Sequence, residues 1–360
     1  MNNWRESHCV FEEIAHLKGQ GRSCALAVIV RLEGSAYRQP GAKLLVRDDG
    51  TLVGNVSGGC LESDVREVGL KIMKGEAPKR LHYDTTGRED VVWGLGVGCG
   101  GKVDILVQSC AAAGLGDIVE PVRGLLKGNE PFALSTVVSG PSAGRVVVHT
   151  RTGVLAGCTG HAELDRQIAA TAADQLRAEK SVFRESGDTG VFTEILVPPP
   201  SLVICGAGDD TMPLVRLATD AGFRVTVADH RPAFVTEERF PTAFQRVVAR
   251  PEEAAPEIPS GPGTFAVVKT HVLVHDRGWV ERFVASGARY VGVLGSQSRR
   301  EEIMRGLTPE QRDAIHGPIG LDLGAEGPDQ VAVSIVAELL AVWSGRKPQH
   351  LKDRKRPIHG

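Results

Sequence analysis

The sequence predicts an α/β protein in two parts, and three features point to that organisation. After residue 200, short apolar runs alternate with helical stretches, which is typical of a mostly parallel, doubly wound sheet. Before residue 197, short β-branched runs dominate, and glycine-rich segments interrupt them. Between the two parts stand three prolines, which cannot donate ladder hydrogen bonds and favour an extended spacer. We expect an N-terminal mixed α+β domain with glycine-rich loops over 1–197, a linker over 198–200, a Rossmann-like domain over 201–345 and a basic tail over 346–360.

The elements of the first part are expected from β-branched runs and helical periodicity. Predicted strands cover 25–32, 42–47, 103–107, 134–138 and 146–149, and predicted helices lie near 62–74 and 163–180. The sequence contains no repeat of fixed period and no low-complexity segment.

The second part is expected to alternate strands with helices. A strand at 202–205, a helix at 212–221 and a strand at 224–228 are followed by buried runs at 265–269 and 290–294. The last helix begins at Pro328, where the missing N–H costs little, and carries one apolar stripe from Ala332 to Trp343. Gly345 is the expected end of this helix, because glycine accepts the left-handed conformation of many C-caps.

Composition excludes several classes of protein. The 360 residues carry 42 Lys and Arg against 44 Asp and Glu, so there is no basic excess of the kind that nucleic-acid binders show. Aromatic residues make up only 5%, which argues against a surface that stacks on sugars or bases. Glycine reaches 43 residues, and we expect this excess in tight loops near ligands. No apolar run approaches the roughly 20 residues of a membrane span. Seven cysteines, with no C-x-x-C pair, indicate a reducing compartment and hence a cytoplasmic protein.

A glycine turn in the second part predicts a nucleotide site. The strand ending at Cys205 runs into Gly206-Ala-Gly208 and then a helix, so backbone N–H groups face a phosphate. Asp229 closes the next strand, where a carboxylate can hold a ribose diol. Thr211 takes the place of the third glycine, and Asp209 with Asp210 adds negative charge that should weaken binding of a bare pyrophosphate. The alternative is a Rossmann-shaped domain whose loop binds nothing or binds another nucleotide-bearing molecule.

Three glycine-rich segments in the first part predict an anion site with a thiol. They are 34–43, which contains Arg38 and Lys43, then 54–62, and 94–101. Exposed glycine backbone forms anion-binding nests, and Ser57-Gly-Gly precedes a predicted helix whose dipole would add to them. Cys60 and Cys99 lie in two of these segments, and a thiolate suits sulfur transfer or a transition metal. The alternative is that these glycines form tight turns and the cysteines are small buried apolar residues.

Two further segments carry polar residues after predicted strands. His271 and His275, with Asp276, could bind a metal if helical, but we favour a strand-end His271 that lines the nucleotide crevice. Ser296 is a candidate helix N-cap, and Arg299 and Arg300 after it either grip an anion or form a solvated face.

Taken in order, these segments resemble the XdhC/CoxI family, the accessory proteins of molybdenum hydroxylases such as xanthine dehydrogenase. The resemblance covers nearly the whole chain, and its segments are 34–43, 56–62, 96–101, 205–208, 229–232, 270–271, 290–296, 317–324 and 331–338. Asp209 departs from the family, which commonly has histidine there, and Tyr37 replaces a frequent proline.

The resemblance implies a chaperone for the molybdenum cofactor, a molybdopterin in simple or nucleotide-extended form. Such a protein binds the cofactor as cargo, helps it acquire a sulfido ligand from a cysteine desulfurase, and delivers it to an apo molybdenum hydroxylase. No catalytic residue and no direct metal ligand is predicted, although Cys60 or Cys99 would face the molybdenum. The candidate cofactor-binding residues are Arg38, Lys43, Ser57, Gly58, Gly59, Cys60, Glu62, Gly98, Cys99, Gly100, Gly101, Gly206, Gly208, Asp229, His271 and Ser296.

An enzyme is the alternative. An NAD-dependent oxidoreductase would use Gly206, Gly208 and Asp229 for NAD(H), with His271 as acid/base. In either case we expect a homodimer, with no nucleic acid or membrane as partner.

Overall fold

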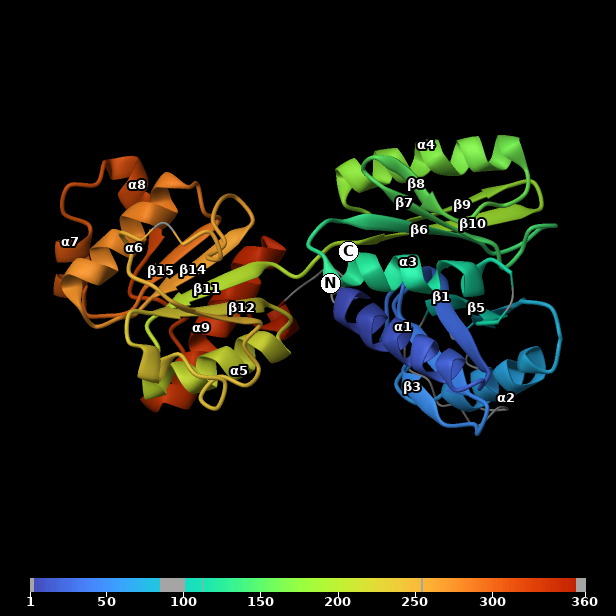
Figure 1. Cartoon of the computed structure of the whole chain (residues 1–360), viewed down its shortest axis with the longest axis horizontal. Helices are drawn as coiled ribbons and strands as arrows, with labels where there is room; N and C mark the ends of the chain where they lie inside the picture. The colour runs from blue at the N-terminus through green and yellow to red at the C-terminus, as the bar shows by residue number, and fades with distance from the viewer. Residues whose placement is uncertain (1–2, 85–100, 112, 254, 354–360) are drawn as a thin grey trace. The chain divides into compact units, whose positions relative to one another are not determined.

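A computed structural model describes residues 3–84, 101–111, 113–253 and 255–353 of the chain (Figure 1). The chain divides into two compact units, the first reaching to Pro198 and the second beginning at Pro199. Within the described ranges, no helix is both long and apolar enough to cross a membrane.

The first unit opens with a helix and a five-stranded antiparallel sheet. The elements are α1 (Asn3–Gly19), β1 (Cys24–Gly34), β2 (Lys43–Arg47), β3 (Leu52–Gly54), α2 (Glu62–Met73), β4 (Lys79–Asp84) and β5 (Gly101–Ser109). The strands lie in the order β3-β2-β1-β5-β4. We call this the first repeat.

A second set of elements follows in the same unit. It consists of α3 (Leu115–Lys127), β6 (Phe132–Val137), β7 (Val146–Thr150), β8 (Gly153–Ala156), α4 (Ala162–Ala178), β9 (Val182–Ser186) and β10 (Thr189–Leu196). Its antiparallel sheet has the order β8-β7-β6-β10-β9. We call this the second repeat.

The two repeats share one topology, since each runs helix, three strands, helix, two strands, and arranges the strands identically. Two glycines at equivalent places make the same close contact. A Cβ on Gly54, at the end of the third strand, would lie 2.4 Å from the carbonyl oxygen of Lys43, the first residue of β2. A Cβ on Gly157 would lie 2.1 Å from the carbonyl oxygen of Val146, the first residue of β7. The sequence shows no repeat of fixed period because the duplication lies in the topology and not in similar residues at a constant spacing.

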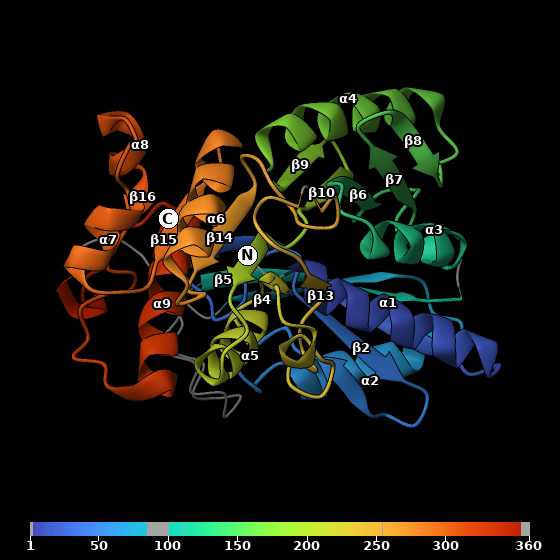
Figure 2. The same ribbon diagram turned by 60° about the vertical axis from the view of Figure 1, so that its left-hand side comes forward.

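The helices of the first unit form layers with the two sheets, as Figures 1 and 2 show. Apolar residues of α1 and α3, such as Phe11 and Val119, pack with Leu26 of the first sheet and Leu134 of the second. Helix α2 covers the other face of the first sheet, and α4 covers the other face of the second. The central strands of each sheet are therefore buried on both faces, whereas the edge strands β4, β8 and β9 stay largely exposed.

The second unit is a parallel, doubly wound sheet. Its elements are β11 (Ser201–Cys205), α5 (Met212–Asp220), β12 (Arg224–Asp229), β13 (Gln245–Val248), β14 (Thr264–Val268), α6 (Leu273–Ala285), β15 (Tyr290–Val293), α7 (Gln297–Ile303), α8 (Pro309–Asp313), β16 (Ile315–His316) and α9 (Gly327–Ser344). All described pairings in the sheet are parallel, in the order β13-β12-β11-β14-β15-β16.

The strand order changes direction between β11 and β14, which is where ligands of such folds bind. Helices α5 and α9 pack on one face of the sheet, and α6 packs on the other (Figure 1). Gly345 ends α9 with a φ of 64°, as the sequence predicts. The predicted fold class is confirmed: antiparallel α+β sheets at the N-terminus, then a Rossmann-like parallel sheet.

Candidate functional site

The glycine-rich segments of the first repeat all leave the first sheet at one edge. Strands β1, β3 and β4 end there, and β2 and β5 begin there, because each neighbouring pair is antiparallel. Gly34 pairs with Gly101, and a Cβ on Gly101 would lie 2.4 Å from the carbonyl oxygen of Ser35. Gly98, Cys99 and Gly100 lie outside the described residues. We call this edge, with its connections 35–42 and 55–61, the glycine edge.

Connection 55–61 is held by a carboxylate of the helix that follows it. Glu62 accepts hydrogen bonds from the amides of Ser57 (2.8 Å) and Val56 (3.2 Å) and from the Ser57 hydroxyl. Ser57 Oγ in turn accepts from the amides of Gly59 and Leu61, each at 3.1 Å. Burial opposes ionisation of Glu62, but these hydrogen bonds outweigh it and hold the pKa below its usual value. Glu62 and Ser57 thus shape the loop from within.

The same loop presents a thiol and free backbone donors. Cys60 is a free, half-buried cysteine beside Leu61, which is packed under α2. Among the described residues, the amides of Gly58 and Cys60 have no hydrogen-bond partner. The N-terminus of α2 follows directly, so its dipole adds positive potential at the loop. This arrangement suits an anionic ligand that carries a soft atom.

The two cations predicted for this site are already paired. Lys43 is buried, and its Nζ lies 2.7 and 2.8 Å from the carboxylate oxygens of Glu194 on β10 and 2.9 Å from the carbonyl oxygen of Gly41. Arg38 contacts Glu6 of α1 at 2.5 Å. Lys43 therefore joins the two repeats, and both cations hold connection 35–42 in place.

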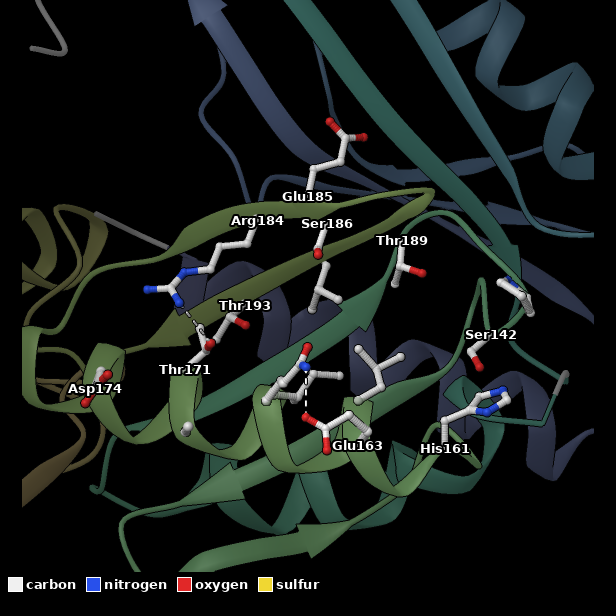
Figure 3. A pocket seen from close by; sticks show the side chains of 16 residues that line it. Ser142, His161, Glu163, Thr171, Asp174, Arg184, Glu185, Ser186, Thr189 and Thr193 are labelled. Atoms are coloured by element: carbon white, nitrogen blue, oxygen red, sulfur yellow. Dashed lines mark hydrogen bonds between the residues drawn. The ribbon is translucent and has the colours of Figure 1, made fainter.

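The second repeat has a pocket of about 730 Å³ between α4 and the β9–β10 hairpin (Figure 3). Ser142 and His161, from the two connections equivalent to those of the glycine edge, line it together with Thr189 at the start of β10. At the opposite end, the guanidinium of Arg184 donates to the Thr171 hydroxyl at 3.4 Å. The second repeat therefore has a pocket that runs from the equivalent edge along α4.

Its loop before α4 parallels connection 55–61. Asp165 in the first turn of α4 accepts from the amide of Thr159 at 2.8 Å, and Cys158 beside it is exposed and free. Cys158 is a residue of this loop that was not predicted from the sequence as part of a site. Both loops share one sequence pattern. Each contains a glycine, a cysteine and a hydroxyl residue, and a helix with a carboxylate in its first turn follows.

The glycine turn of the second unit is tied to Asp229. Gly206 has a φ of 115°, and a Cβ there would lie 2.5 Å from the carbonyl oxygen of Lys269, so glycine is required. Asp229 accepts from the amide of Ala207 at 2.8 Å and from the guanidinium of Arg231 at 2.9 and 3.0 Å. Burial raises the pKa of Asp229, but these donors lower it to about 2 overall. The carboxylate predicted to hold a ribose is engaged by its own chain.

The negative charge expected at Asp209 and Asp210 is compensated. Arg239 contacts Asp209 at 2.7 Å, and Lys269 contacts Asp210 at 2.8 Å. Gly208 lies beside this pair, since a Cβ on it would meet Asp210 Oδ1 at 2.8 Å. The expected repulsion of a phosphate by two bare carboxylates is therefore much reduced.

His271 stands at the carboxyl end of β14, at the point where the strand order changes direction. Its side chain is exposed, its φ is 63°, and its Nε2 lies 3.7 Å from Asp210 Oδ2. His275 packs instead against His230, with ring centroids 4.7 Å apart. In the described ranges no group of three His, Cys, Asp or Glu residues could hold a metal ion.

Ser296 is the N-cap of α7, as predicted, and accepts from the amide of Arg299 at 3.4 Å. The guanidinium of Arg299 contacts the fully buried Asp276 at 2.6 Å. Asp276 also accepts from the amide and hydroxyl of Thr270, which follows β14. Arg299 therefore fixes the end of β14 instead of gripping an anion.

The chain matches two family models and is similar in sequence to known proteins. The model described as "XdhC and CoxI family" matches residues 17–84, and the model described as "XdhC Rossmann domain" matches residues 202–339. The chain is 33% identical over 317 residues to a probable xanthine dehydrogenase subunit of Bacillus subtilis, covering 88% of this chain and 92% of that protein. Over 93 residues it is 29% identical to "Molybdenum cofactor insertion chaperone PaoD" of Escherichia coli, covering 26% of this chain and 28% of that one.

A solved structure agrees with these matches. A crystal structure from Bacillus halodurans, described as that of a xanthine dehydrogenase, is similar to this chain with a TM-score of 0.76 at 27% identity, covering 96% of this chain and 97% of that chain. With a relative at 33% identity across most of both chains, and family models on both units, the chain belongs to the XdhC and CoxI family.

Proposed function

We propose that this chain is an accessory protein of a molybdenum hydroxylase, and that it binds the molybdenum cofactor as cargo for insertion. Family membership supports an accessory role, and the relative named as a molybdenum cofactor insertion chaperone supports the choice of cargo. The observation that carries the proposal to particular residues is the meeting of the glycine-rich connections at one edge of the first sheet.

The glycine edge would hold the cargo through backbone donors. The amides of Gly58 and Cys60, with the dipole of α2 behind them, suit an anionic phosphate or dithiolene group. Glu62 and Ser57 would act as positioning residues, because they shape the loop and carry no free donor toward the ligand. Arg38 and Lys43 would fix the neighbouring connection through Glu6 and Glu194.

Cys60 would face the molybdenum end of the cargo. A thiolate is a soft ligand, and Cys60 is a half-buried free thiol in this loop. Cys99 is the second candidate from the sequence. In this proposal the chain holds the cofactor while a cysteine desulfurase supplies its sulfido ligand, and then passes it to the apo-hydroxylase.

The test is binding of molybdenum cofactor to the purified full chain, kept anaerobic, followed by activation of an apo molybdenum hydroxylase. The variants are Cys60→Ser, Cys99→Ser and the double change, with Cys158→Ser as the matched control in the second repeat. We expect stoichiometric binding that the double change weakens and the control leaves intact. Light scattering on the same samples tests the expected homodimer.

Three outcomes would count against parts of the proposal. Tight binding that both cysteine changes leave intact would remove the thiols from the site. Loss of binding in Cys158→Ser would move the site to the second repeat. Absence of cofactor binding together with tight binding of NAD(H) would favour the oxidoreductase.

A further inference from the structure

A buried lysine stands where the strand order of the second unit changes direction. Lys269 follows β14 directly, and its side chain is 2% exposed. Its Nζ lies 2.8 Å from Asp210 Oδ2 and donates to Thr211 Oγ1 at 2.9 Å. Thr211 in turn donates to the carbonyl oxygen of Gly206 at 2.8 Å. An ammonium has three hydrogens, so one remains for another acceptor.

A cavity of about 200 Å³ adjoins this pair. Apart from Asp210 and Lys269, its lining is apolar or glycine: Leu214, Leu294, Gly327, Pro328, Val331, Ala332 and Ile335. The N-terminus of α9, an 18-residue helix, forms part of the wall and adds positive potential. The cavity thus combines one cation with a short apolar chamber.

The partner of Lys269 is the more replaceable half of the pair. The side chain of Asp210 is 32% exposed and sits on a single 3₁₀ turn, whereas Lys269 is enclosed. If the Asp210 carboxylate moved outward, it would approach His271, which is exposed and whose Nε2 already lies 3.7 Å from Asp210 Oδ2. His271 holds a left-handed backbone that non-glycine residues rarely adopt, and such strain gathers at ligand sites.

We propose that this cavity binds a small molecule with one carboxylate and a short apolar body, whose carboxylate replaces Asp210 at Lys269. The exchange leaves the buried ammonium paired throughout, so the cost of an isolated buried charge does not arise. Burial lowers the pKa of Lys269 and the Asp210 charge raises it, which means that losing the anion without replacement would favour the neutral amine.

The size of the cavity limits the ligand. An engineered apolar cavity of about 150 Å³ binds benzene, so a chamber of about 200 Å³ takes an aromatic or short aliphatic acid. A whole dinucleotide is larger than this cavity, which is open to solvent on one side, and would extend beyond it. This site lies in the second unit and does not depend on the function proposed for the glycine edge.

Calorimetric titration of the full chain tests the proposal, with benzoate and butyrate as probes and benzamide as the neutral counterpart. We expect a carboxylate to bind at least about ten-fold more tightly than benzamide, since charge-assisted hydrogen bonds are the stronger class. Asp210→Asn should strengthen benzoate binding about ten-fold, because it removes the competing carboxylate. Asp209→Asn, which removes the neighbouring carboxylate paired with Arg239, should leave it unchanged.

A second pair of variants guards against misfolding at the ion pair. Val331→Phe on α9 would fill the cavity, whereas Val333→Phe on the exposed face of the same helix would not. The proposal expects the first to abolish benzoate binding and the second to leave it intact, with circular dichroism confirming both folds.

Three results would overturn the proposal. Asp210→Asn that leaves carboxylate binding undetectable or no tighter would overturn the exchange with Asp210. Binding of benzoate that survives Val331→Phe would place it elsewhere. Tight binding of inorganic phosphate or NADH in place of the carboxylates would overturn the chemical class.

Discussion

The first and second repeats have the same strand order and the same buried framework, but their connections differ. In the first repeat, β4 and β5 are joined by residues 85–100, which include much of the predicted glycine-rich segment. In the second repeat, β9 and β10 are joined by Gly187 and Asp188. A shared scaffold with different loops is how folds acquire separate chemistry, since loops tolerate change that buried strands do not.

Charged groups near the loops of the two repeats are engaged by the protein itself. Each loop before the second helix is tied by an early helix carboxylate, Glu62 in one and Asp165 in the other. Lys43, at the start of β2, is paired with Glu194 of the second repeat. On the proposed function, a ligand at the glycine edge would meet backbone donors and a thiol among the described residues, since Lys43 and Arg38 are engaged by carboxylates.

Removing the ion pair that joins the two repeats should lower the free energy of unfolding more than any other change considered below. Lys43→Met removes the cation of a buried ion pair and leaves the Glu194 carboxylate with only the Asn3 side-chain amide, at 3.1 Å, as a donor. Such a loss costs about 3 to 5 kcal/mol of unfolding free energy. Chemical denaturation of the full chain measures it, and Lys102→Met, at an exposed pair with Asp84, is the control. A midpoint for Lys43→Met equal to that of the control would show that the pair does not hold the repeats together.

The next effect tests whether the repeats are equivalent. Gly54→Ala and Gly157→Ala each place a methyl group against a strand carbonyl at a positive φ. Strain of this kind costs about 1 to 3 kcal/mol. We expect both variants to unfold at similar denaturant concentrations, below that of Gly59→Ala, which shares the positive φ but whose added Cβ would meet no atom within 4 Å, so the difference reports the clash with the carbonyl oxygen. A loss of stability in only one of the two variants would show that the two glycines are not equivalent.

A smaller effect separates the repeats by function. Glu62→Gln removes the charge that organises connection 55–61 and should cost about 1 to 2 kcal/mol. It should also weaken cofactor binding, while Asp165→Asn in the second repeat should not. Equal loss of binding in the two variants would argue that neither loop is the site.

The pH dependence of Glu62 has a definite sign. Its pKa is lowered in the folded protein, so its stabilising contribution is complete above the usual glutamate pKa of about 4.3. That contribution is lost as the pH falls through the folded value. As the pH is lowered, the difference in unfolding free energy between wild type and Glu62→Gln should therefore become smaller. A difference that stays constant down to acid pH would contradict the assigned hydrogen bonds.

Local patterns predicted much of the fold. The runs at 25–32, 146–149 and 202–205 became strands because β-branched residues fit a buried sheet, and Gly345 ended α9 as a left-handed cap. Helix α1 was missed, although Val10, Phe11, Ile14 and Leu17 have helical spacing and are buried. The mixed charge of that segment hid its apolar face.

The candidate site was less predictable, because its defining contacts join distant residues. Glu194 lies far from Lys43 in the sequence, and no local pattern signals that pairing. The same holds for Asp229 with Ala207 and for Lys269 with Asp210. Sequence patterns located the glycine segments, but only the strand order showed that they share one edge.

Hydrogen exchange of the full chain, with and without bound molybdenum cofactor, tests whether the glycine edge holds the cargo. We expect slower exchange of amides in connection 55–61 on binding, with the equivalent loop 157–161 of the second repeat unchanged. Protection of 157–161, or of the 206–211 turn in the second unit, with 55–61 unchanged would contradict it.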